Sequence, residues 1–321
     1  MNKQARYYLA GILIVLLVCL LILISFNPST KDVFTKDTTR SDLLSTIQAR
    51  GKLVTAVEPN YPPSSEIVPN ANRTPGTRCS PSEYTLNEVK GFNVEITAEI
   101  ARRLGVEPCY IMPPRSQTRS GNWADNWDLY PIHYSTEERL KDYYFTQPTF
   151  TTPAAFFVHE NNTEFTHMSD LSGRRIGVCS GCVHEQYLNG TLALPGGTTN
   201  FAVKNATTVA YINEVLAIDD LSTGGQGKID AILTSQMTGR DAIRRGLPLR
   251  QLDDPAFFGY VAPAIDKKGS MDPETFVNKV SEVVQQMHKD GTLLNLSMKY
   301  FSADYTSEAA RFNISALHQF A

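Results

Sequence analysis

A stripe of apolar residues with helical spacing is the clearest local pattern in the chain. It is made of Phe92, Ile96, Ile100 and Leu104, which recur at every fourth position. This spacing puts all of them on one face of a helix, and Gly105 follows where a helix end is expected. The pattern therefore predicts an amphipathic helix from Phe92 to Leu104.

Short apolar runs alternate with such helical stretches along the chain. The runs that predict strands are residues 53–57, 109–112, 127–132, 154–158, 176–179 and 229–233. A second helical stripe comprises Phe276, Val280, Val283 and Met287. This alternation is typical of an α/β protein in which mainly parallel sheets are flanked by crossover helices.

The first part of the chain carries a different hydrophobic pattern. Residues 7–26 contain no charged side chain, and Lys3 and Arg6 precede them. A run of this length is long enough to cross the hydrocarbon core of a bilayer as a helix. The positive flank is expected to stay in the cytoplasm, which places the rest of the chain outside. We therefore expect residues 1–28 to form a cytoplasmic stub and a transmembrane anchor, and residues 29–41 to form a tether.

Two other interpretations of this N-terminal segment stay open. A cleaved signal peptide normally has a shorter apolar region and small residues at its cleavage site, and no Ala-x-Ala pattern follows the run here. A lipoprotein signal needs a small residue before its cysteine, whereas Val18 precedes Cys19. The length of the run favours an uncleaved anchor, but the sequence does not decide whether the segment is cleaved.

Composition and charge narrow the class of protein. Of the 321 residues, 42% are hydrophobic and 20% are charged, as in a folded globular protein. The net charge is −3 and no long basic run occurs, so a nucleic-acid partner is not expected. Five cysteines fit an oxidising compartment, and the four that lie outside the apolar N-terminal segment allow three pairings.

The Asn-x-Ser/Thr pattern occurs six times, at Asn72, Asn161, Asn189, Asn205, Asn295 and Asn313. This pattern is the acceptor site for N-glycosylation in secreted eukaryotic proteins. The sequence thus leaves open whether the chain is bacterial or is a glycosylated eukaryotic protein.

Several segments, taken in order along the chain, resemble one known family. The stretch from Gly91 to Gly105 is followed by Ser135-Thr136-Glu137-Glu138-Arg139 and then by Phe145-Thr146-Gln147-Pro148. Further matching segments are residues 56–63, 171–178, 227–232 and 288–301. In this order they resemble the family 3 extracellular solute-binding proteins, which are periplasmic receptors for polar amino acids that feed ABC transporters. The resemblance covers Lys52 to Asp304.

The resemblance implies a two-lobe fold of the type II periplasmic-binding-protein class. Each lobe would be a mainly parallel sheet flanked by helices. Lobe 1 would be discontinuous and comprise residues 42–158 and 262–304, whereas lobe 2 would comprise residues 159–261. Residues 305–321 would form a C-terminal tail.

The expected lobes also bear on how the cysteines pair. The chain would cross between the lobes near Val158–Asn161 and again near Phe257–Ala262. The pairs Cys79–Cys109 and Cys179–Cys182 are therefore favoured, because each pair falls within one expected lobe.

The resemblance implies a ligand in the cleft between the lobes. Arg139 matches the arginine of lobe 1 that grips the ligand's carboxylate, to which its fork of donors is suited. Gly181, Cys182 and Val183 match the anion site of lobe 2, where a glycine is usually followed by two hydroxyl residues. Backbone amides at a helix start suit an anion, but the hydroxyl side chains are missing here.

Four further positions match residues that contact the ligand in the family, and two of them depart from the usual pattern. Tyr61 matches an aromatic residue that covers the ligand, and Glu58 matches an acid that helps to bind cationic groups. Tyr134 stands where Ser or Thr is usual, so its bulk would reshape the pocket. Ser235 stands where amino-acid binders usually carry the aspartate that pairs with the ligand's α-ammonium group. Losing such a charge-assisted hydrogen bond costs roughly 1.5–3 kcal/mol, which argues for a ligand without an α-amino group or for weak amino-acid binding.

The segment Cys179-Ser180-Gly181-Cys182 invites a separate interpretation, because thioredoxin-like redox sites have this layout at a strand–helix junction. The surrounding sequence does not resemble thioredoxin, so a structural pair is favoured. His133 and His184 lie beside the matched positions and are further candidates for ligand contact. No metal site is predicted, because two cysteines and His184 lack a convincing fourth ligand, and no cofactor is expected.

Together these features predict a non-enzymatic, membrane-anchored binding protein whose bulk is periplasmic or extracellular. It would close two lobes over a small anionic solute, an amino acid or a related organic acid, for uptake through an ABC permease. One alternative is a sensory or degenerate binding ectodomain that acts through a protein partner. A less favoured alternative is a dehydratase-like enzyme on the same fold.

Overall fold

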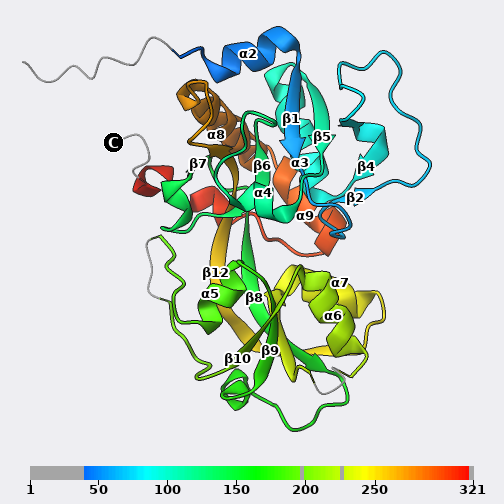
Figure 1. The fold of residues 1–321 in the computed structure, drawn as a ribbon, viewed down its shortest axis with the longest axis vertical. Helices are drawn as coiled ribbons and strands as arrows, with labels where there is room; N and C mark the ends of the chain where they lie inside the picture. Colours follow the sequence, from blue (N-terminus) through cyan, green and yellow to red (C-terminus); the bar gives the residue numbers. More distant parts are fainter. Residues whose placement is uncertain (1–39, 196–198, 225–227, 318–321) are drawn as a thin grey trace, which may run out of the picture. The chain divides into compact units, whose positions relative to one another are not determined.

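Lobe 1 begins with a small sheet built around a parallel strand pair. In the computed structural model, which describes residues 40–195, 199–224 and 228–317, this sheet has the strand order β1-β5-β3. β1 and β5 are parallel neighbours (Figure 1). β3 runs antiparallel to β5. The elements of this part are α2 (Leu43–Arg50), β1 (Lys52–Ala56), β2 (Glu66–Ile67), β3 (Tyr84–Thr85), η1 (Leu86–Glu88), β4 (Val89–Lys90), α3 (Phe92–Leu104) and β5 (Glu107–Ile111).

Helix α3 has the bounds that its apolar stripe predicts. Its stripe is buried in the core of lobe 1, and Gly105 ends the helix in the left-handed conformation at φ 76°. Gly91 precedes the helix at φ 131°, and a Cβ atom on it would lie 2.5 Å from the backbone oxygen of Ser64. Both ends of α3 therefore depend on glycine, the start because of conformation and close approach and the end because of conformation.

A larger mixed sheet runs through both lobes. Its strand order is β10-β9-β11-β8-β12-β6, and β7 also pairs with β12. β9 is parallel to β10 and β11, while β8 is antiparallel to β11 and β12. The elements are α4 (Arg115–Arg119), β6 (Tyr130–Tyr134), η2 (Arg139–Lys141), β7 (Tyr143–Phe145), β8 (Phe150–His159), η3 (Met168–Leu171), β9 (Arg175–Cys179), α5 (Val183–Leu188), β10 (Thr207–Tyr211), α6 (Glu214–Ser222), β11 (Ala231–Ser235), α7 (Gln236–Arg244) and β12 (Leu249–Asp266).

Strands β8 and β12 connect the two lobes (Figure 1). Phe150, at the start of β8, packs in the core of lobe 1, whereas Phe156 packs in the core of lobe 2. In β12, Phe257 belongs to the core of lobe 2 and Val261 to that of lobe 1. The first crossing therefore comes earlier in the chain than residues 158–161.

The sheets are mixed, which corrects the expectation of mainly parallel sheets. The reason lies in the connecting strands, since β8 carries the chain out of lobe 1 and β12 carries it back. Two neighbouring strands that cross in opposite directions must pair antiparallel, as they do over most of their length. The parallel pairs that the alternating pattern predicts are those outside the crossing, β1 with β5 and β9 with β10 and β11.

The C-terminal segments complete lobe 1. They are α8 (Glu274–Lys289), α9 (Thr292–Phe301), η5 (Ala309–Arg311) and η6 (Ile314–Leu317). The predicted stripe of α8 is buried in the core of lobe 1. Beyond α9, the backbone oxygen of Tyr305 accepts a 2.7 Å hydrogen bond from the backbone N–H of Thr151. The start of the expected C-terminal tail thus packs against β8 where that strand leaves lobe 1.

Two disulfides confirm the favoured cysteine pairing. Cys79–Cys109 joins the long loop before β3 to β5, with the two Cα atoms 5.4 Å apart. Cys179–Cys182 joins the end of β9 to the residue that precedes α5, with the two Cα atoms 5.6 Å apart. Each disulfide lies within one lobe, so neither restricts the movement of one lobe relative to the other.

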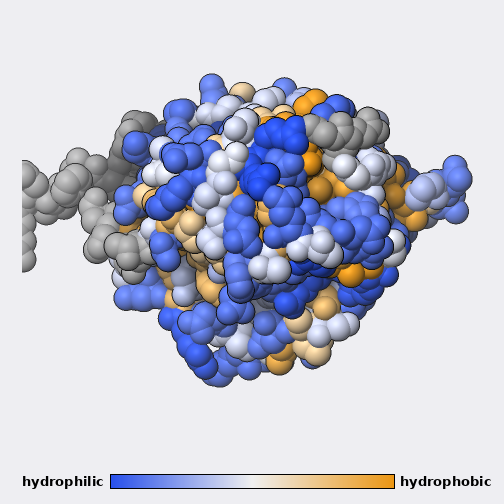
Figure 2. All heavy atoms as spheres, turned by 90° about the horizontal axis from the view of Figure 1, so that it is seen from below, coloured by the Kyte–Doolittle hydropathy of each residue, from blue (hydrophilic) through white to orange (hydrophobic). Residues whose placement is uncertain are grey.

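The expected anchor and almost all of the expected tether, residues 1–39, lie outside the described residues. Among the helices that the structure does describe, none has the length and apolar character needed to cross a membrane. The face of the molecule seen in Figure 2 is mostly hydrophilic, and its hydrophobic residues are scattered in small groups.

Candidate ligand-binding site

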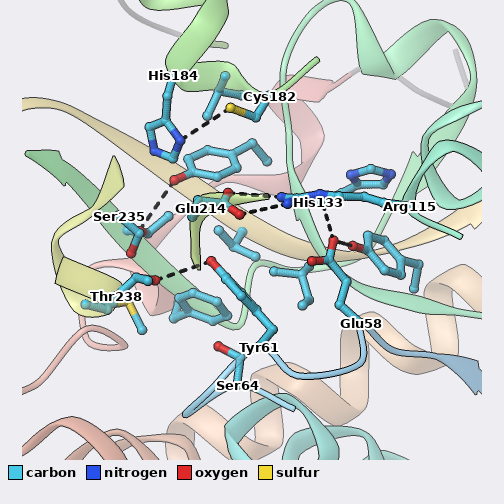
Figure 3. A pocket seen from close by; sticks show the side chains of 18 of the residues that line it. Glu58, Tyr61, Ser64, Arg115, His133, Cys182, His184, Glu214, Ser235 and Thr238 are labelled. Atoms are coloured by element: carbon cyan, nitrogen blue, oxygen red, sulfur yellow. Dashed lines mark hydrogen bonds and ion pairs between the residues drawn. The ribbon is translucent and has the colours of Figure 1, made fainter. Parts of the chain in front are cut away.

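A small cavity lies between the two lobes. Its volume is about 50 Å³, which is room for a few water-sized groups, since one water needs roughly 10–15 Å³ on the same scale. Polar side chains from both lobes point toward one another there (Figure 3). Lobe 1 contributes Glu58, Tyr61, Arg115, Arg119, His133, Tyr134 and Arg139, and lobe 2 contributes Cys182, Val183, His184, Glu214, Ser235 and Thr238.

The structure brings together most of the residues that the sequence nominates for ligand contact. Those that line the cavity are Arg139, Tyr61, Glu58, Tyr134, Cys182, Val183 and Ser235. Gly181 is not part of the lining, and its backbone N–H donates to the carboxylate of Glu185. The helix that follows it, α5, has only six residues. The shared location of the seven lining residues is an observation, whereas their contacts with a ligand stay predictions.

Arg139 brings a positive charge into the cavity, and no acid in the described ranges pairs with it. It lies at the start of the short 3-10 helix η2, and its Nη1 donates a long, 3.4 Å hydrogen bond to the backbone oxygen of Tyr134. Among the residues that the structure describes, no carboxylate forms an ion pair with it. Burial, together with the smaller effect of the nearby Arg119, lowers the pKa of Arg139 to about 10. The guanidinium nevertheless stays charged at neutral pH, and its donors are available to an anion.

Arg115 has the opposite environment, because it is held by an acid from each lobe. Its Nη1 lies 2.7 Å from Glu214 Oε2 and its Nη2 donates to Glu214 Oε1 at 3.0 Å. Its Nε lies 3.1 Å from Glu58 Oε1, which also accepts a 2.7 Å hydrogen bond from the hydroxyl of Tyr130 (Figure 3). Arg115 comes from α4 in lobe 1 and Glu214 is the first residue of α6 in lobe 2. This ion pair therefore links the two lobes.

The ion pair keeps Glu214 ionised although its side chain is buried. Burial alone would raise the pKa of Glu214, but its interaction with Arg115 outweighs that effect and the pKa is lowered to about 2. Only 4% of Glu214 is exposed. The carboxylate is therefore negative across the physiological range, and the lobes stay attracted to each other at this point.

The charged residues of the cavity leave an excess of positive charge. Three arginines, Arg115, Arg119 and Arg139, face two carboxylates, Glu58 and Glu214. Burial lowers the pKa of His184 to about 4 and that of His133 well below its usual range, so both imidazoles are uncharged at neutral pH. Arg119 donates to the backbone oxygen of Ser180 at 2.6 Å, which does not neutralise it. A solute with one net negative charge would balance the cavity.

Hydroxyl groups line the part of the cavity around Ser235. The hydroxyl of Thr152 donates to Ser235 Oγ at 3.0 Å and receives a 3.5 Å hydrogen bond from Tyr134. The hydroxyls of Tyr61 and Thr238 lie 3.3 Å apart and join the lobes at a second point (Figure 3). No negative charge stands at the position of Ser235, so an ammonium group there would find only neutral acceptors.

The bulk of Tyr134 is accommodated by a glycine on the neighbouring strand. A Cβ atom on Gly259 would lie 2.4 Å from the ring of Tyr134, so any larger residue would clash with it. Gly259 belongs to β12, the strand that pairs with the one bearing Tyr134. The tyrosine at a position where Ser or Thr is usual is therefore built into the packing of the cavity wall.

The disulfide Cys179–Cys182 reaches the cavity through Cys182. The Nδ1 atom of His184 lies 3.6 Å from each of the two sulfur atoms. Its other nitrogen, Nε2, is buried without a hydrogen-bond partner among the described residues. The imidazole thus faces the sulfurs and has no polar contact that would hold it elsewhere.

Sequence reasoning did not nominate Arg115, Arg119 or Glu214. The two arginines lie four residues apart, which is the spacing of neighbours on a helix, but the segment around them reads as a polar loop. Glu214 follows Asn213, whose side chain accepts a hydrogen bond from the backbone N–H of Leu216 and caps α6. An asparagine cap followed by an acid predicts a helix start, but nothing local indicates that this acid faces an arginine 99 residues away.

Comparisons with known proteins identify one matching family. The family described as bacterial extracellular solute-binding proteins, family 3, matches residues 53–303. The L-cystine-binding protein TcyJ of Escherichia coli K12 is 26% identical over 267 residues, which are 82% of this chain and 88% of that protein. The histidine-binding periplasmic protein of the same strain is 22% identical over 233 residues, 70% of this chain and 83% of that protein.

Solved structures show the same fold. The structure of Tv2483 bound to L-arginine superposes with a TM-score of 0.67 at 20% identity and covers 85% of this chain and 100% of its own. An ancestral amino-acid-binding protein, AncCDT-1, described as a precursor of cyclohexadienyl dehydratase, gives a TM-score of 0.63 at 20% identity, with 80% and 99% covered. At these identities the likeness establishes the two-lobe fold.

Proposed function

The chain belongs to the bacterial extracellular solute-binding proteins of family 3, and from this premise we propose that it binds a small carboxylate-bearing solute for ABC-type uptake. The solute is an amino acid or a related organic acid, and the two lobes close over it. The N-terminal segment 7–26 holds the protein at the membrane, with its bulk outside the cytoplasm. A permease of the ABC type is the partner that receives the solute.

The observation that carries this proposal is the charge of Arg139, which no carboxylate of the described residues pairs with. A partly buried guanidinium without a carboxylate partner is costly to keep in a protein. A solute carboxylate would accept two parallel hydrogen bonds from the fork of donors and neutralise the charge. The excess of positive charge in the cavity has the same implication for the sign of the solute.

The cavity also favours a class of carboxylate. Ser235 offers a neutral hydroxyl, and the two acids that line the cavity, Glu58 and Glu214, are both engaged by Arg115. An α-ammonium group would have to compete with Arg115 for one of them. We therefore infer that carboxylates without an α-amino group, such as keto acids, bind more tightly than the corresponding amino acids. The volume of about 50 Å³ limits the solute of this closed arrangement to a small one.

Contacts between the lobes support a closing motion about β8 and β12. Arg115 pairs with Glu214, Arg119 donates to the backbone oxygen of Ser180, and Tyr61 meets Thr238. Each of these contacts joins lobe 1 to lobe 2 beside the cavity. A hinge at two crossing strands with polar contacts at the cleft is the usual arrangement for domain closure around a ligand.

A thermal-shift screen of the purified full-length chain tests this function. The screen compares amino acids, keto acids, dicarboxylates and sugars, and a ligand at a hundred times its dissociation constant stabilises the fold by roughly 2.7 kcal/mol. We expect a shift with small carboxylates that Arg139→Gln removes and that the exposed control Arg311→Gln retains. A shift with neutral sugars alone, or an undiminished shift in Arg139→Gln, would contradict the proposal.

Two other functions can be tested with the same set of solutes. A chain that responds to no solute would fit a degenerate binder whose cleft is filled by its own ion pair and whose partner is a protein. Loss of a tested acid with time, followed by chromatography, would indicate a dehydratase-like activity on this fold.

A further inference from the structure

Four side chains with metal-binding atoms converge at one wall of the cavity. They are Cys179 at the end of β9, Cys182 before α5, His184 in the first turn of α5 and Glu214 at the start of α6. All four are buried, with exposed fractions of 0%, 3%, 3% and 4%. One ligand atom from each residue lies within 4.8 Å of the corresponding atoms of the others. The sequence alone offers only two cysteines and a histidine here, and the fold supplies the fourth group.

We propose that reduction of the Cys179–Cys182 disulfide creates a four-ligand site for a borderline or soft divalent cation of the zinc class, held by both thiolates, His184 and Glu214. Two sulfurs, one imidazole nitrogen and one carboxylate oxygen are ligands that zinc accepts in tetrahedral sites. The site requires no new residue to enter, because all four groups are already adjacent. It goes beyond solute binding, which does not use the cysteine sulfurs.

The redox step needs an external reductant, for which a dithiol suffices. One thiolate of the dithiol attacks the sulfur of Cys182, which lines the cavity, and the bond to Cys179 breaks with the electron pair leaving on that sulfur. The second thiol of the reductant then displaces Cys182, so that the reductant becomes a cyclic disulfide and the protein gains two thiols. Binding of the cation releases the two thiol protons to solvent.

The geometry leaves the two other ligands able to bind. His184 presents Nδ1 to the sulfurs at 3.6 Å, which is the atom that would bind the cation. The two oxygens of Glu214 accept hydrogen bonds from Arg115, which leaves further lone pairs on the same oxygens. Arg115 would then support a metal-bound carboxylate from outside, as the hydrogen-bonded partners of metal ligands commonly do.

The other disulfide offers a comparison within the same chain. Near Cys79 and Cys109 the third group is Glu83, and no histidine accompanies them in this cluster. This second cluster therefore offers three candidate ligands, whereas the cluster in lobe 2 offers four. We therefore assign the metal site to lobe 2 alone.

Cobalt(II) titration of the full-length chain tests the site, because tetrahedral cobalt bound to thiolate has a sulfur-to-cobalt charge-transfer band and intense d–d bands. The chain is reduced with dithiothreitol, freed of the reductant under nitrogen and titrated beside the oxidised chain. Alkylation followed by peptide mass spectrometry identifies which cysteines are free. We expect one cobalt per chain with both spectral features after reduction, and neither feature before it.

Variants separate this site from other binding. Cys179→Ser/Cys182→Ser should lose the charge-transfer band, whereas Cys79→Ser/Cys109→Ser should retain it. His184→Asn and Glu214→Gln each remove a ligand, so they should weaken cobalt binding by at least the roughly 10- to 100-fold that loss of an outer hydrogen-bonding partner costs a metal site. Asp219→Asn removes an exposed acid from the same helix as Glu214 and should leave the affinity unchanged.

Three results would overturn the assignment. One is the absence of the charge-transfer band when both Cys179 and Cys182 are free to alkylation. Another is a cobalt affinity that neither His184→Asn nor Glu214→Gln changes, which would mean that only sulfur binds. The third is a Cys179–Cys182 disulfide that stays intact in the folded chain while Cys79–Cys109 is reduced. The reduced wild-type spectrum is decisive even where a variant fails to fold.

Discussion

Arg115 and Arg139 line the same cavity but have contrasting partners. Arg115 is held between Glu58 of lobe 1 and Glu214 of lobe 2, with ion-pair distances of 3.1 and 2.7 Å. Within the part of the chain that the structure describes, the guanidinium of Arg139 has only a 3.4 Å hydrogen bond to a backbone oxygen. Burial lowers the pKa of Arg139 to about 10, whereas the acids around Arg115 raise its pKa despite burial. The protein's own carboxylates neutralise Arg115 without a solute. No carboxylate of the described residues does so for Arg139.

The difference separates two tasks that an arginine side chain can perform. A guanidinium satisfied by the protein's own carboxylates links the lobes and contributes to the folded, closed arrangement. A guanidinium without an acidic partner contributes little to stability and keeps its donors for a ligand. Stability and solute affinity should therefore respond to different arginines.

The largest expected effect is on stability. Arg115→Gln leaves Glu214 buried without its partner, so it should lower the free energy of unfolding by about 3–5 kcal/mol. Arg139→Gln removes a charge that has no partner and should leave the free energy of unfolding unchanged or slightly higher. Denaturant unfolding at pH 7 measures both. The double variant Arg115→Gln/Glu214→Gln should recover part of the loss, and equal losses for Arg115→Gln and Arg139→Gln would contradict the comparison.

Lowering the pH should affect stability through the surroundings of Arg115, because groups there titrate. The pKa of His184 is lowered by burial from 6.5 to about 4, so the unfolded chain binds its proton first as the pH falls. His184 should therefore lower the free energy of unfolding between about pH 6.5 and pH 4 by about 3 kcal/mol at most, and the lowered pKa of His133 acts in the same direction. The pKa of Glu214 is lowered from 4.5 to about 2, so the contribution of its ion pair is lost in a second window between those values.

The variant His184→Asn tests the share of His184 in the first of these windows. It should reduce the dependence of unfolding on pH between about 6.5 and 4 without abolishing it, because the pKa of His133 is also lowered. The more acidic window should stay in place. Chemical denaturation at a series of pH values provides the measurement. An unchanged slope in the upper window would show that His184 does not cause it.

The cavity that Arg139 lines can be changed by placing an acid at position 235. Ser235→Asp restores a carboxylate where amino-acid binders of the family usually carry aspartate. We expect the preference to shift toward α-amino acids over the matching keto acids by roughly 10- to 100-fold, the equivalent of about 1.5–3 kcal/mol for one charge-assisted hydrogen bond. Ser235→Asn has a similar shape without the charge and should leave the preference unchanged. Competition calorimetry with an amino acid and its keto analogue measures the ratio.

The smallest effect should come from the neutral contact between the lobes. Tyr61→Phe removes the hydroxyl that lies 3.3 Å from Thr238, which is worth about 0.5–1.5 kcal/mol. Solute affinity should fall by about tenfold at most, much less than in Arg139→Gln. A loss in Tyr61→Phe as large as that in Arg139→Gln would mean that closure, and not charge, dominates binding.

Local signals in the sequence predict the parts of the structure that are encoded locally. Helix α3 begins and ends where its stripe and Gly105 indicate, and the cysteine pairs follow from the expected lobes. The resemblance to a family predicts that Arg139 lies in the cavity. The ion pair of Arg115 with Glu214 could not be predicted, because the two residues are 99 positions apart and only the fold brings them together. The antiparallel crossing strands were missed for a similar reason, since their direction depends on the path of the whole chain.

Calorimetric titration of a small keto acid into Arg139→Gln and Arg139→Lys tests the central claim most directly. We predict that Arg139→Gln loses the binding seen in the wild-type chain, by 2–5 kcal/mol as an order of magnitude for one partner of a buried charge pair. Arg139→Lys should recover part of it, because the charge returns without the fork of donors. Wild-type affinity in Arg139→Gln would contradict the account, since the carboxylate would then be bound elsewhere.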